Sequence, residues 1–279
     1  MSKIVVLKSG SRAQLDPLHS GFAHGFGIFE TIKLAGGRLE FWKAHYKRLL
    51  HSANVFNLHF EETETTILEA IRELVQSEKL CNVAVKLSLL DVGTDVCCYI
   101  YSRHIELPGD NVRLHLSTGS SLNEHSVLAG HKTHNYMESV HLKRLSKKAG
   151  FYDVVRLNTA GLLSETTAAN LFFVKDNRLY TPAVSTGILP GVIRAEVVEA
   201  ARKHSIPVEE GHYLVEDLEA ANVAFLTNSS IGIVPVSSID AGDYTRYFDI
   251  SHQMVETLKV ALSDAKKRKS VMLTDEKTS

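Results

Sequence analysis

The chain has 279 residues, a formal net charge of −1 and a hydrophobic content of 44%. This length and apolar content suit one large domain or two modest ones with a real core. A charge this close to zero excludes the strong basic field typical of proteins that bind nucleic acid or anionic membranes. No apolar run reaches membrane-spanning length, and the first residues lack a signal peptide's hydrophobic stretch. We therefore expect neither a nucleic-acid nor a membrane partner.

The chain has three cysteines, Cys81, Cys97 and Cys98, an odd number that cannot all pair in disulfides, and they form no Cys-x-x-Cys pattern. Such cysteines are typical of small apolar side chains in a reducing compartment, so we expect a cytoplasmic protein. The histidines near residue 132 have no cysteine partner and no His-Glu-x-x-His spacing. We expect no metal site.

Strand and helix patterns alternate through the whole chain, which predicts a mixed α/β protein. Strands are predicted at residues 4–7, 28–34, 83–90, 96–101, 112–116, 152–157, 171–174, 179–180, 223–227 and 231–236. Helices are predicted at residues 42–56, 65–79, 136–150, 191–204, 215–221 and 247–265.

The polar run at residues 117–126 (STGSSLNEHS) has few apolar residues and is the predicted interdomain linker. It separates an N-terminal domain, residues 1–116, from a C-terminal domain, residues 127–265. The basic and polar residues 266–279 are predicted to be a disordered tail.

Lys132 lies in the small, polar stretch of residues 130–136 (GHKTHNY). A lysine there contributes little to a core, and an amine with a lowered pKa can form a Schiff base with an aldehyde. A solvated lysine in a linker is the alternative.

Three further features are compatible with a phosphorylated aldehyde cofactor. Glu165 lies among small residues, where a carboxylate could keep a pyridine nitrogen protonated. Residues 187–194 (GILPGVIR) place glycine and proline ahead of a helix, whose free N–H groups suit a phosphate. Arg48, on the helix at residues 42–56, could add a guanidinium to that phosphate. Taken singly, each is also typical of an ordinary surface or turn residue.

Taken in order, these motifs resemble the fold-type IV pyridoxal-phosphate enzymes. This is the class IV aminotransferase family, which includes branched-chain aminotransferases, D-amino-acid aminotransferases and 4-amino-4-deoxychorismate lyases. The matching segments span nearly the whole chain: residues 27–31, 45–49, 131–136, 163–165, 170–172, 181–182, 187–194, 227–230 and 234–236. The resemblance implies two α/β domains with pyridoxal 5'-phosphate between them, and a homodimer in which the partner completes the site.

The resemblance also implies roles for single residues. Lys132 would form the Schiff base and shuttle the proton, Glu165 would hold the pyridine nitrogen, and Tyr136 would lie near the cofactor's phenolate. The further residues implied at the cofactor's phosphate or ring are Arg48, Asn170, Leu189, Val192, Ile193, Asn228 and Ser229.

Thr31 favours a lyase, because the lyases resemble this chain here, whereas branched-chain aminotransferases typically carry glycine. Its hydroxyl could assist proton delivery near Lys132. Phe29 replaces the tyrosine with which D-amino-acid aminotransferases hold the substrate carboxylate, and a phenylalanine cannot donate that hydrogen bond. Arg103 is a candidate carboxylate binder, and Lys86 stands where an arginine often lies.

We therefore expect an aminodeoxychorismate lyase of folate synthesis, acting on a small, amino-acid-like substrate. The alternatives are an aminotransferase for branched-chain L-amino acids or D-amino acids, and a cofactor-binding protein without turnover.

Overall fold

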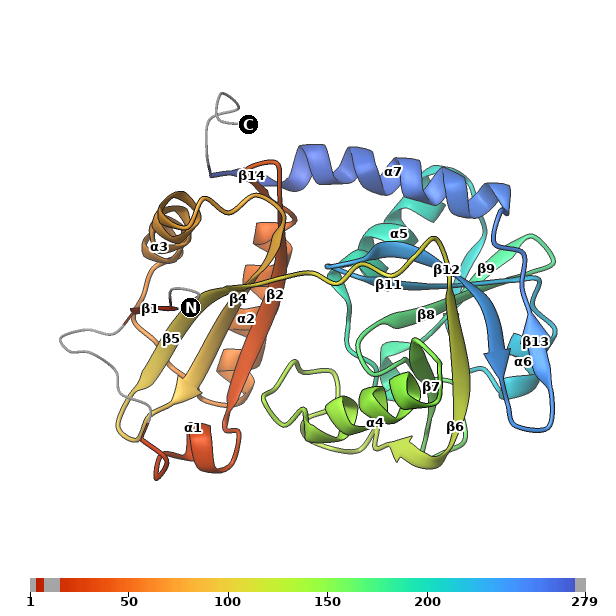
Figure 1. Ribbon diagram of the computed structural model, residues 1–279, viewed down its shortest axis with the longest axis horizontal. Helices are drawn as coiled ribbons and strands as arrows, with labels where there is room; N and C mark the ends of the chain where they lie inside the picture. Colours follow the sequence, from red (N-terminus) through yellow and green to blue (C-terminus); the bar gives the residue numbers. More distant parts are fainter. Residues whose placement is uncertain (1–3, 8–15, 274–279) are drawn as a thin grey trace. The chain divides into compact units, whose positions relative to one another are not determined.

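The computed structural model describes residues 4–7 and 16–273. The chain forms two compact units (Figure 1). Of the described residues, 4–7, 16–106, 131–135 and 266–273 belong to the first unit, and residues 107–130 and 136–265 belong to the second. Each unit combines a β-sheet with helices, which confirms the predicted mixed α/β class.

The first unit contains an antiparallel sheet of six strands in the order β1-β5-β4-β2-β3-β14. The strands are β1 (Ile4–Leu7), β5 (Val96–Arg103), β4 (Val83–Asp91), β2 (Gly27–Ala35), β3 (Arg38–Leu39) and β14 (Val271–Met272).

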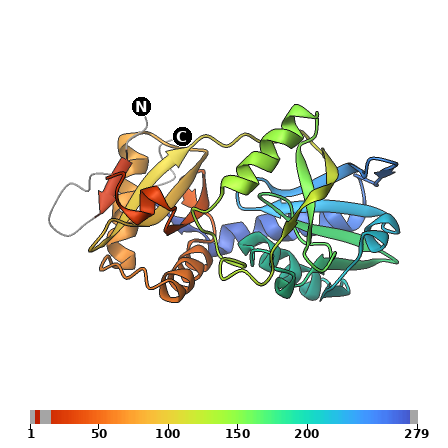
Figure 2. The same ribbon diagram turned by 90° about the horizontal axis from the view of Figure 1, so that it is seen from below.

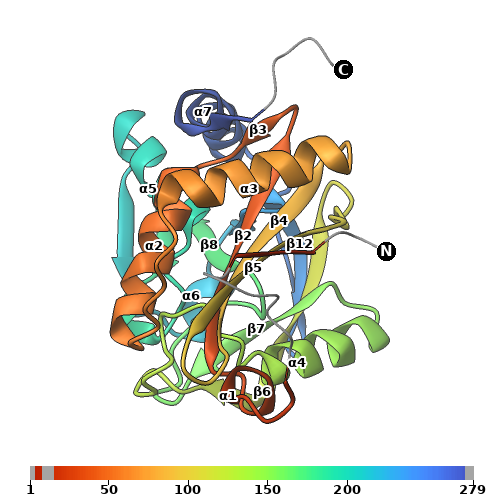
Figure 3. The ribbon, with the colours of Figure 1, turned by 90° about the vertical axis from the view of Figure 1, so that its left-hand side faces the viewer.

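Helices α2 (Trp42–Val55) and α3 (Glu64–Ser77) pack against this sheet, and the short α1 (Ser20–Ala23) precedes β2 (Figure 3). The Thr63 hydroxyl caps α3 by accepting a hydrogen bond from the Thr66 N–H at 3.2 Å. Alternate residues of the strands join the apolar faces of both helices in one core. That core includes Ile28, Ile32, Trp42, Leu49, Ile67, Ile71, Leu74, Val85, Leu87, Leu89, Cys98 and Ile100.

The second unit contains a mixed sheet in the order β10-β9-β8-β11-β12-β6-β7, with β13 paired to β12. Helices α4 (Met137–Lys148) and α5 (Val192–Lys203) lie on opposite sides of its strands (Figure 2). The remaining elements are β6 (Val112–Leu122), β7 (Asp153–Asn158), β8 (Asn170–Lys175), β9 (Arg178–Pro182), the 3₁₀-helix η1 (Val184–Thr186), β10 (Val208–Gly211), α6 (Val215–Glu219), β11 (Val223–Asn228), β12 (Gly232–Asp240), β13 (Thr245–Tyr247) and α7 (Gln253–Lys269).

Residues 117–122, predicted to begin a linker, are instead the second half of β6. Ser121 and Leu122 pair with Leu157 and Asn158 of β7. Backbone pairing needs no particular side chain, so a polar sequence can form a strand when a partner is available. Residues 131–135 belong to the first unit, which differs from the predicted assignment of residues 127–265 to one domain.

The C-terminal region also differs from the prediction. The last helix begins at Gln253 rather than near residue 247, because Thr245–Tyr247 pairs with β12 as a strand. It continues through Lys266–Lys269, which were predicted to belong to the tail; cations in a last turn suit the helix dipole. Residues 274–279 lie outside the described residues. Among the described residues, no helix combines the length and apolar character needed to cross a membrane.

We expect Phe172→Ala to lower the free energy of unfolding of the protein by about 3–5 kcal/mol. Phe172 is fully buried in the second unit and stacks on Phe225, with ring centroids 5.0 Å apart, so truncation would leave a cavity. Urea unfolding checks this, with Tyr247→Ala, at a side chain that is 72% exposed, as the control. A shift no larger than the control's would contradict it.

Candidate functional site

Main-chain hydrogen bonds hold Lys132 beside β2. The Phe29 N–H donates to the Lys132 carbonyl at 2.8 Å, and the His134 N–H donates to the Gly27 carbonyl at 2.9 Å. The segment therefore acts as a short extra strand along the start of β2. This pairing explains why a lysine so distant in sequence from β2 belongs to the first unit.

The Lys132 amine lies over the Phe29 ring, with Nζ 4.6 Å from the ring centroid. Lys86 on β4 approaches the same ring, its Nζ 3.5 Å from the centroid, and donates a hydrogen bond to Thr31 Oγ1 at 3.0 Å. Phe29 and Thr31 are two residues apart on β2 and so share one face of the sheet. Both predicted catalytic residues and Phe29 therefore lie together.

Lys86 is only 7% exposed. Burial, followed by the positive charges of Lys132 and Arg103, lowers the pKa of Lys86 to about 6. Arg103 is exposed at the end of β5, and its positive charge contributes to the lowered pKa of Lys86.

Glu30 points to the opposite face of β2, toward α2. Its carboxylate accepts hydrogen bonds from Arg48 Nε and Nη2, both at 2.7 Å, and lies 2.8 Å from His45 Nδ1. Burial by itself would raise the pKa of Glu30, but Arg48 and His45 outweigh burial and hold that pKa well below its usual range. Burial lowers the pKa of His45 in spite of Glu30. The pair with Glu30 fixes the orientation of the Arg48 guanidinium.

In the second unit, Asn170 connects two predicted cofactor residues. Its Nδ2 donates to Glu165 Oε2 and to the Leu189 carbonyl, each at 2.9 Å. A Cβ on Gly191 would lie 2.0 Å from Asn170 Oδ1, so only glycine allows this close approach. The structure therefore brings Glu165, Asn170 and the residues before α5 together.

Helix α5 begins after Gly191 with its first N–H groups directed outward from the helix end. No side chain among the described residues caps it, and its first turn carries no acidic residue. The N–H groups of Val192 and Ile193 are therefore suited to hold a phosphate, as predicted from the residues before the helix.

Tyr136 immediately precedes α4, and its hydroxyl donates to the Thr167 carbonyl at 2.6 Å. Burial, and then the nearby Glu165 and Asp153 carboxylates, raise the pKa of Tyr136. The tyrosine is therefore a neutral donor near Glu165.

The turn after β11 carries the predicted Asn228 and Ser229. Asn228 Nδ2 donates to the Ala168 carbonyl at 3.0 Å, and Asn228 Oδ1 accepts the N–H groups of Ser230 and Ile231, both at 2.9 Å. These bonds fix the turn on which Ser229 lies half-buried.

The sequence analysis did not identify several polar side chains that the structure places near the predicted site residues. Glu30 and His45 were seen only as parts of motifs, although a charged residue among the apolar residues of a strand signals a buried partner. Lys86 was noted only as a replacement for arginine. The buried Thr227 hydroxyl, on β11 in register with Asn170, has no hydrogen-bond partner among the described residues. An orphaned hydroxyl there is consistent with a ligand site.

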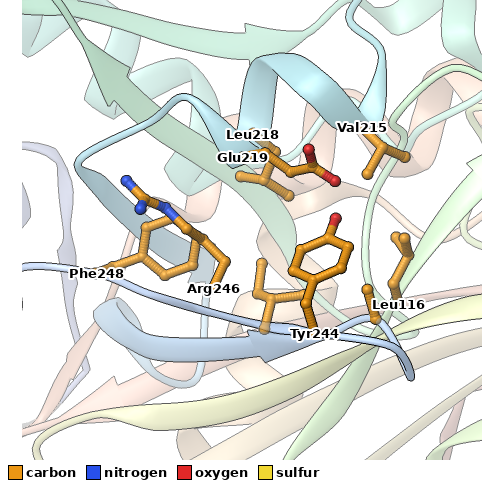
Figure 4. A pocket seen from close by; sticks show the side chains of 9 residues that line it. Leu116, Val215, Leu218, Glu219, Tyr244, Arg246 and Phe248 are labelled. Carbon is orange, nitrogen blue, oxygen red and sulfur yellow. The ribbon is translucent and has the colours of Figure 1, made fainter.

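A separate pocket in the second unit is lined mainly by apolar side chains, together with Arg246 and Glu219 (Figure 4). Arg246 Nη2 donates to the Ala221 carbonyl at 2.5 Å. No lining residue of this pocket is a predicted site residue.

Comparison with known proteins identifies the family. The sequence pattern of amino-transferase class IV matches residues 27–239. An aminodeoxychorismate lyase of Vibrio harveyi is 29% identical over 233 residues, which are 79% of this chain and 85% of the relative. A Thermotoga maritima protein, described provisionally as a branched-chain-amino-acid aminotransferase, is 31% identical over 217 residues, 76% of this chain and 77% of the relative. A solved structure from Legionella pneumophila, described provisionally as a 4-amino-4-deoxychorismate lyase, has a TM-score of 0.84 and 27% identity, covering 93% of this chain and 98% of that one.

The chain belongs to the class IV aminotransferase family. The predicted family, fold class and pyridoxal-phosphate-dependent enzyme class are confirmed. The residues present suit this cofactor: a lysine amine in the first unit, and an uncapped helix start and an oriented carboxylate in the second.

We expect Glu30→Gln to lower the free energy of unfolding by about 3–5 kcal/mol at neutral pH, because it removes one partner of a buried ion pair. The folded-state pKa of Glu30 lies below its ordinary value of 4.5, so its contribution to stability is present above that pH and is lost as pH falls. Urea unfolding between pH 3 and pH 7 should therefore show the difference between wild type and variant shrinking in acid. A pH-independent difference would contradict this assignment.

Proposed function

We propose that the chain is a pyridoxal-phosphate-dependent aminodeoxychorismate lyase, which converts 4-amino-4-deoxychorismate to 4-aminobenzoate and pyruvate. The observation that carries this proposal is the Thr31 hydroxyl, which lies on the same face of β2 as Phe29 and is hydrogen-bonded to Lys86. A glycine here would supply no hydroxyl. The Vibrio harveyi and Legionella pneumophila relatives support the same activity.

The residues of the first unit divide the proton transfers between them. When bound, pyridoxal phosphate supplies an electron sink for the substrate. Lys132 Nζ removes the proton from the ring carbon that carries the amino group. The bond between the adjacent ring carbon and the enolpyruvyl oxygen then breaks, so the ring becomes aromatic and the enol of pyruvate leaves. Thr31 Oγ1 gives its proton to the methylene carbon of that enol and takes up the proton that Lys132 removed, so pyruvate forms and both side chains return to their starting state.

The second unit supplies cofactor-binding groups in this proposal. Glu165, held by Asn170, keeps the pyridine nitrogen protonated. The N–H groups of Val192 and Ile193 hold the phosphate. The further proposed contacts are Arg48 and Ser229 at the phosphate, Asn228 supporting that turn, Tyr136 near the phenolate and Leu189 against the ring.

An aminotransferase for branched-chain L-amino acids is the second candidate, supported by the Thermotoga maritima relative. The same lysine serves either reaction, because transamination differs only in where the proton is returned. Phe29 argues against a D-amino-acid aminotransferase, since its ring offers no hydroxyl for a carboxylate.

Two measurements test the proposed reaction. We expect pyruvate to appear from 4-amino-4-deoxychorismate, and we expect the cofactor's absorbance band to stay unchanged when L-leucine or D-alanine is added without a keto acid. Lys132→Ala should abolish both the band and pyruvate release, whereas Lys47→Ala, at an exposed position of α2, should preserve both. Conversion of the band by L-leucine would instead establish the aminotransferase, and turnover by Lys132→Ala would overturn the mechanism.

We also propose a homodimer with the active site near its interface. Three apolar side chains of α4 are exposed to solvent: Met137 is 85%, Val140 40% and Leu145 48% exposed. Apolar side chains grouped in this way on one helix are typical of an interface. Met137 directly follows Tyr136, so a partner seated on α4 would lie next to a proposed cofactor residue.

The double variant Met137→Glu, Leu145→Glu should therefore shift the protein from dimer to monomer, because it places two charges on the apolar surface. Sedimentation velocity measures this, with Val260→Glu, at a side chain that is 63% exposed on α7, as a control that remains dimeric. A wild-type monomer, or a double variant that stays dimeric, would contradict the proposed interface.

A cytoplasmic location is the remaining part of the proposal. Among the described residues, all three cysteines are free, and Cys97 and Cys98 are buried neighbours on β5. Unpaired cysteines of this kind suit a reducing compartment.

A further inference from the structure

The buried carboxylate of Asp153, at the start of β7, has no role in the reaction just described. Asp153 is only 1% exposed, and its two oxygens have different partners. Asp153 Oδ2 accepts a hydrogen bond from Lys143 Nζ on α4 at 3.0 Å, which forms an ion pair. Asp153 Oδ1 accepts from the Thr167 hydroxyl and from the Val154 N–H, both at 2.8 Å. Because a buried charge needs such partners, the carboxylate and the groups that it binds hold one another in place.

Thr167 lies in a tight turn at residues 166–169. The Thr166 N–H donates to the Ala169 carbonyl at 2.9 Å, which closes the turn. Thr167 is 5% exposed, and its N–H, at 3.4 Å, points to the same Asp153 oxygen as its hydroxyl. Asp153 therefore holds this turn through both donors of Thr167.

The carbonyl groups of the same turn hold two of the proposed cofactor residues. The Tyr136 hydroxyl donates to the Thr167 carbonyl at 2.6 Å, and Asn228 Nδ2 donates to the Ala168 carbonyl at 3.0 Å. Glu165, which is proposed to hold the pyridine nitrogen, immediately precedes the turn. The position of the turn therefore sets the positions of side chains on several sides of the proposed cofactor site.

We propose that Asp153 and Thr167 are positioning residues for the cofactor: the carboxylate fixes the turn, and the turn fixes Tyr136 and Asn228. This inference rests on the proposed function, which assigns Tyr136 to the cofactor's phenolate and Asn228 to the support of the phosphate-binding turn. A phenol has one hydrogen, so the direction of the Thr167 carbonyl sets the direction in which the Tyr136 hydroxyl points. Asp153 and Thr167 act through these side chains and not on the reacting atoms.

Helix α4 is tied to the same carboxylate. Tyr136 immediately precedes the helix and Lys143 follows seven residues later, so about two helical turns place them on one side of α4. Tyr136 binds the Thr167 carbonyl, and Lys143 binds the Asp153 carboxylate to which Thr167 donates. These bonds together fix the start of α4 against β7 and the turn.

The charge of Asp153 supports the same arrangement. Burial, and then the Glu165 and Asp153 carboxylates, raise the pKa of Tyr136. Arg156 acts in the opposite direction, but its Nη2 is paired with Glu138 Oε2 at 2.7 Å. The phenol therefore keeps the hydrogen that its bond to the turn requires.

The variants Thr167→Val and Thr167→Ser test the inference in the holoenzyme. Valine has nearly the shape of threonine but cannot donate to Asp153, whereas serine keeps the hydroxyl. We expect Thr167→Val to weaken the binding of pyridoxal 5'-phosphate by about tenfold and to shift the NMR resonance of Tyr136 Cζ, which Tyr136→Phe assigns. Thr167→Ser should resemble the wild type in both measurements. Lys259→Met, which breaks an exposed ion pair on α7, is the control and should also resemble it.

A double-variant cycle shows whether Asp153 acts through Thr167. Asp153→Ala is combined with Lys143→Met, so that no buried cation loses its partner. Adding Thr167→Val to this pair should change cofactor affinity by less than about twofold, because the bond that it removes is already absent. Asp153→Asn with Lys143→Met keeps an oxygen acceptor and should leave the Tyr136 resonance near its wild-type position. Full additivity of the changes, or an unmoved resonance in Thr167→Val, would overturn the inference.

Pyruvate release from 4-amino-4-deoxychorismate is measured on the same samples, and urea unfolding reports that each variant is folded. Coupled effects on cofactor affinity and on the Tyr136 resonance, in a protein that releases no pyruvate, would uphold the positioning role and refute the lyase. Pyruvate release together with uncoupled effects would uphold the lyase and refute the positioning role.

Discussion

The hydrogen bonds between the start of β2 and the segment around Lys132 are the constraint on which the first unit's chemistry depends. They place Lys132 over the Phe29 ring although about 100 residues of chain separate the two. Both bonds are made by backbone groups, so they fix the segment's direction whatever its side chains. The surroundings of Lys132 are then set by the side chains that β2 and β4 place on that face of the sheet.

The alternation of side chains along β2 separates two electrostatic environments. On one face, Glu30 holds Arg48, and the pair keeps a buried carboxylate ionised. On the other face, burial and then the positive charges of Lys132 and Arg103 lower the pKa of Lys86 to about 6. The two faces of the sheet thus hold an ionised carboxylate on β2 and an amine with a lowered pKa on β4, because burial penalises a charge that lacks an opposite charge beside it.

In the second unit, close packing rather than charge fixes the positions of the proposed site residues. Asn170 fits closely against Gly191, where a Cβ would lie 2.0 Å from the Asn170 Oδ1, and the Asn170 amide orients Glu165. The start of α5 is left without a side-chain cap among the described residues. A rigid support beside unsatisfied N–H groups is the arrangement expected of a site prepared for an anion.

Local patterns in the sequence were enough to determine most helices and strands, the mixed α/β class, and the family, because hydrophobic periodicity and ordered motifs are properties of neighbouring residues. They also singled out Lys132, Glu165 and Arg48. They could not show that residues 117–122 pair as a strand, that Lys132 joins the first unit, or that Lys86 meets Thr31. These depend on backbone pairing and burial between distant segments, and the effect of burial on a charge is set only when the chain has folded around it.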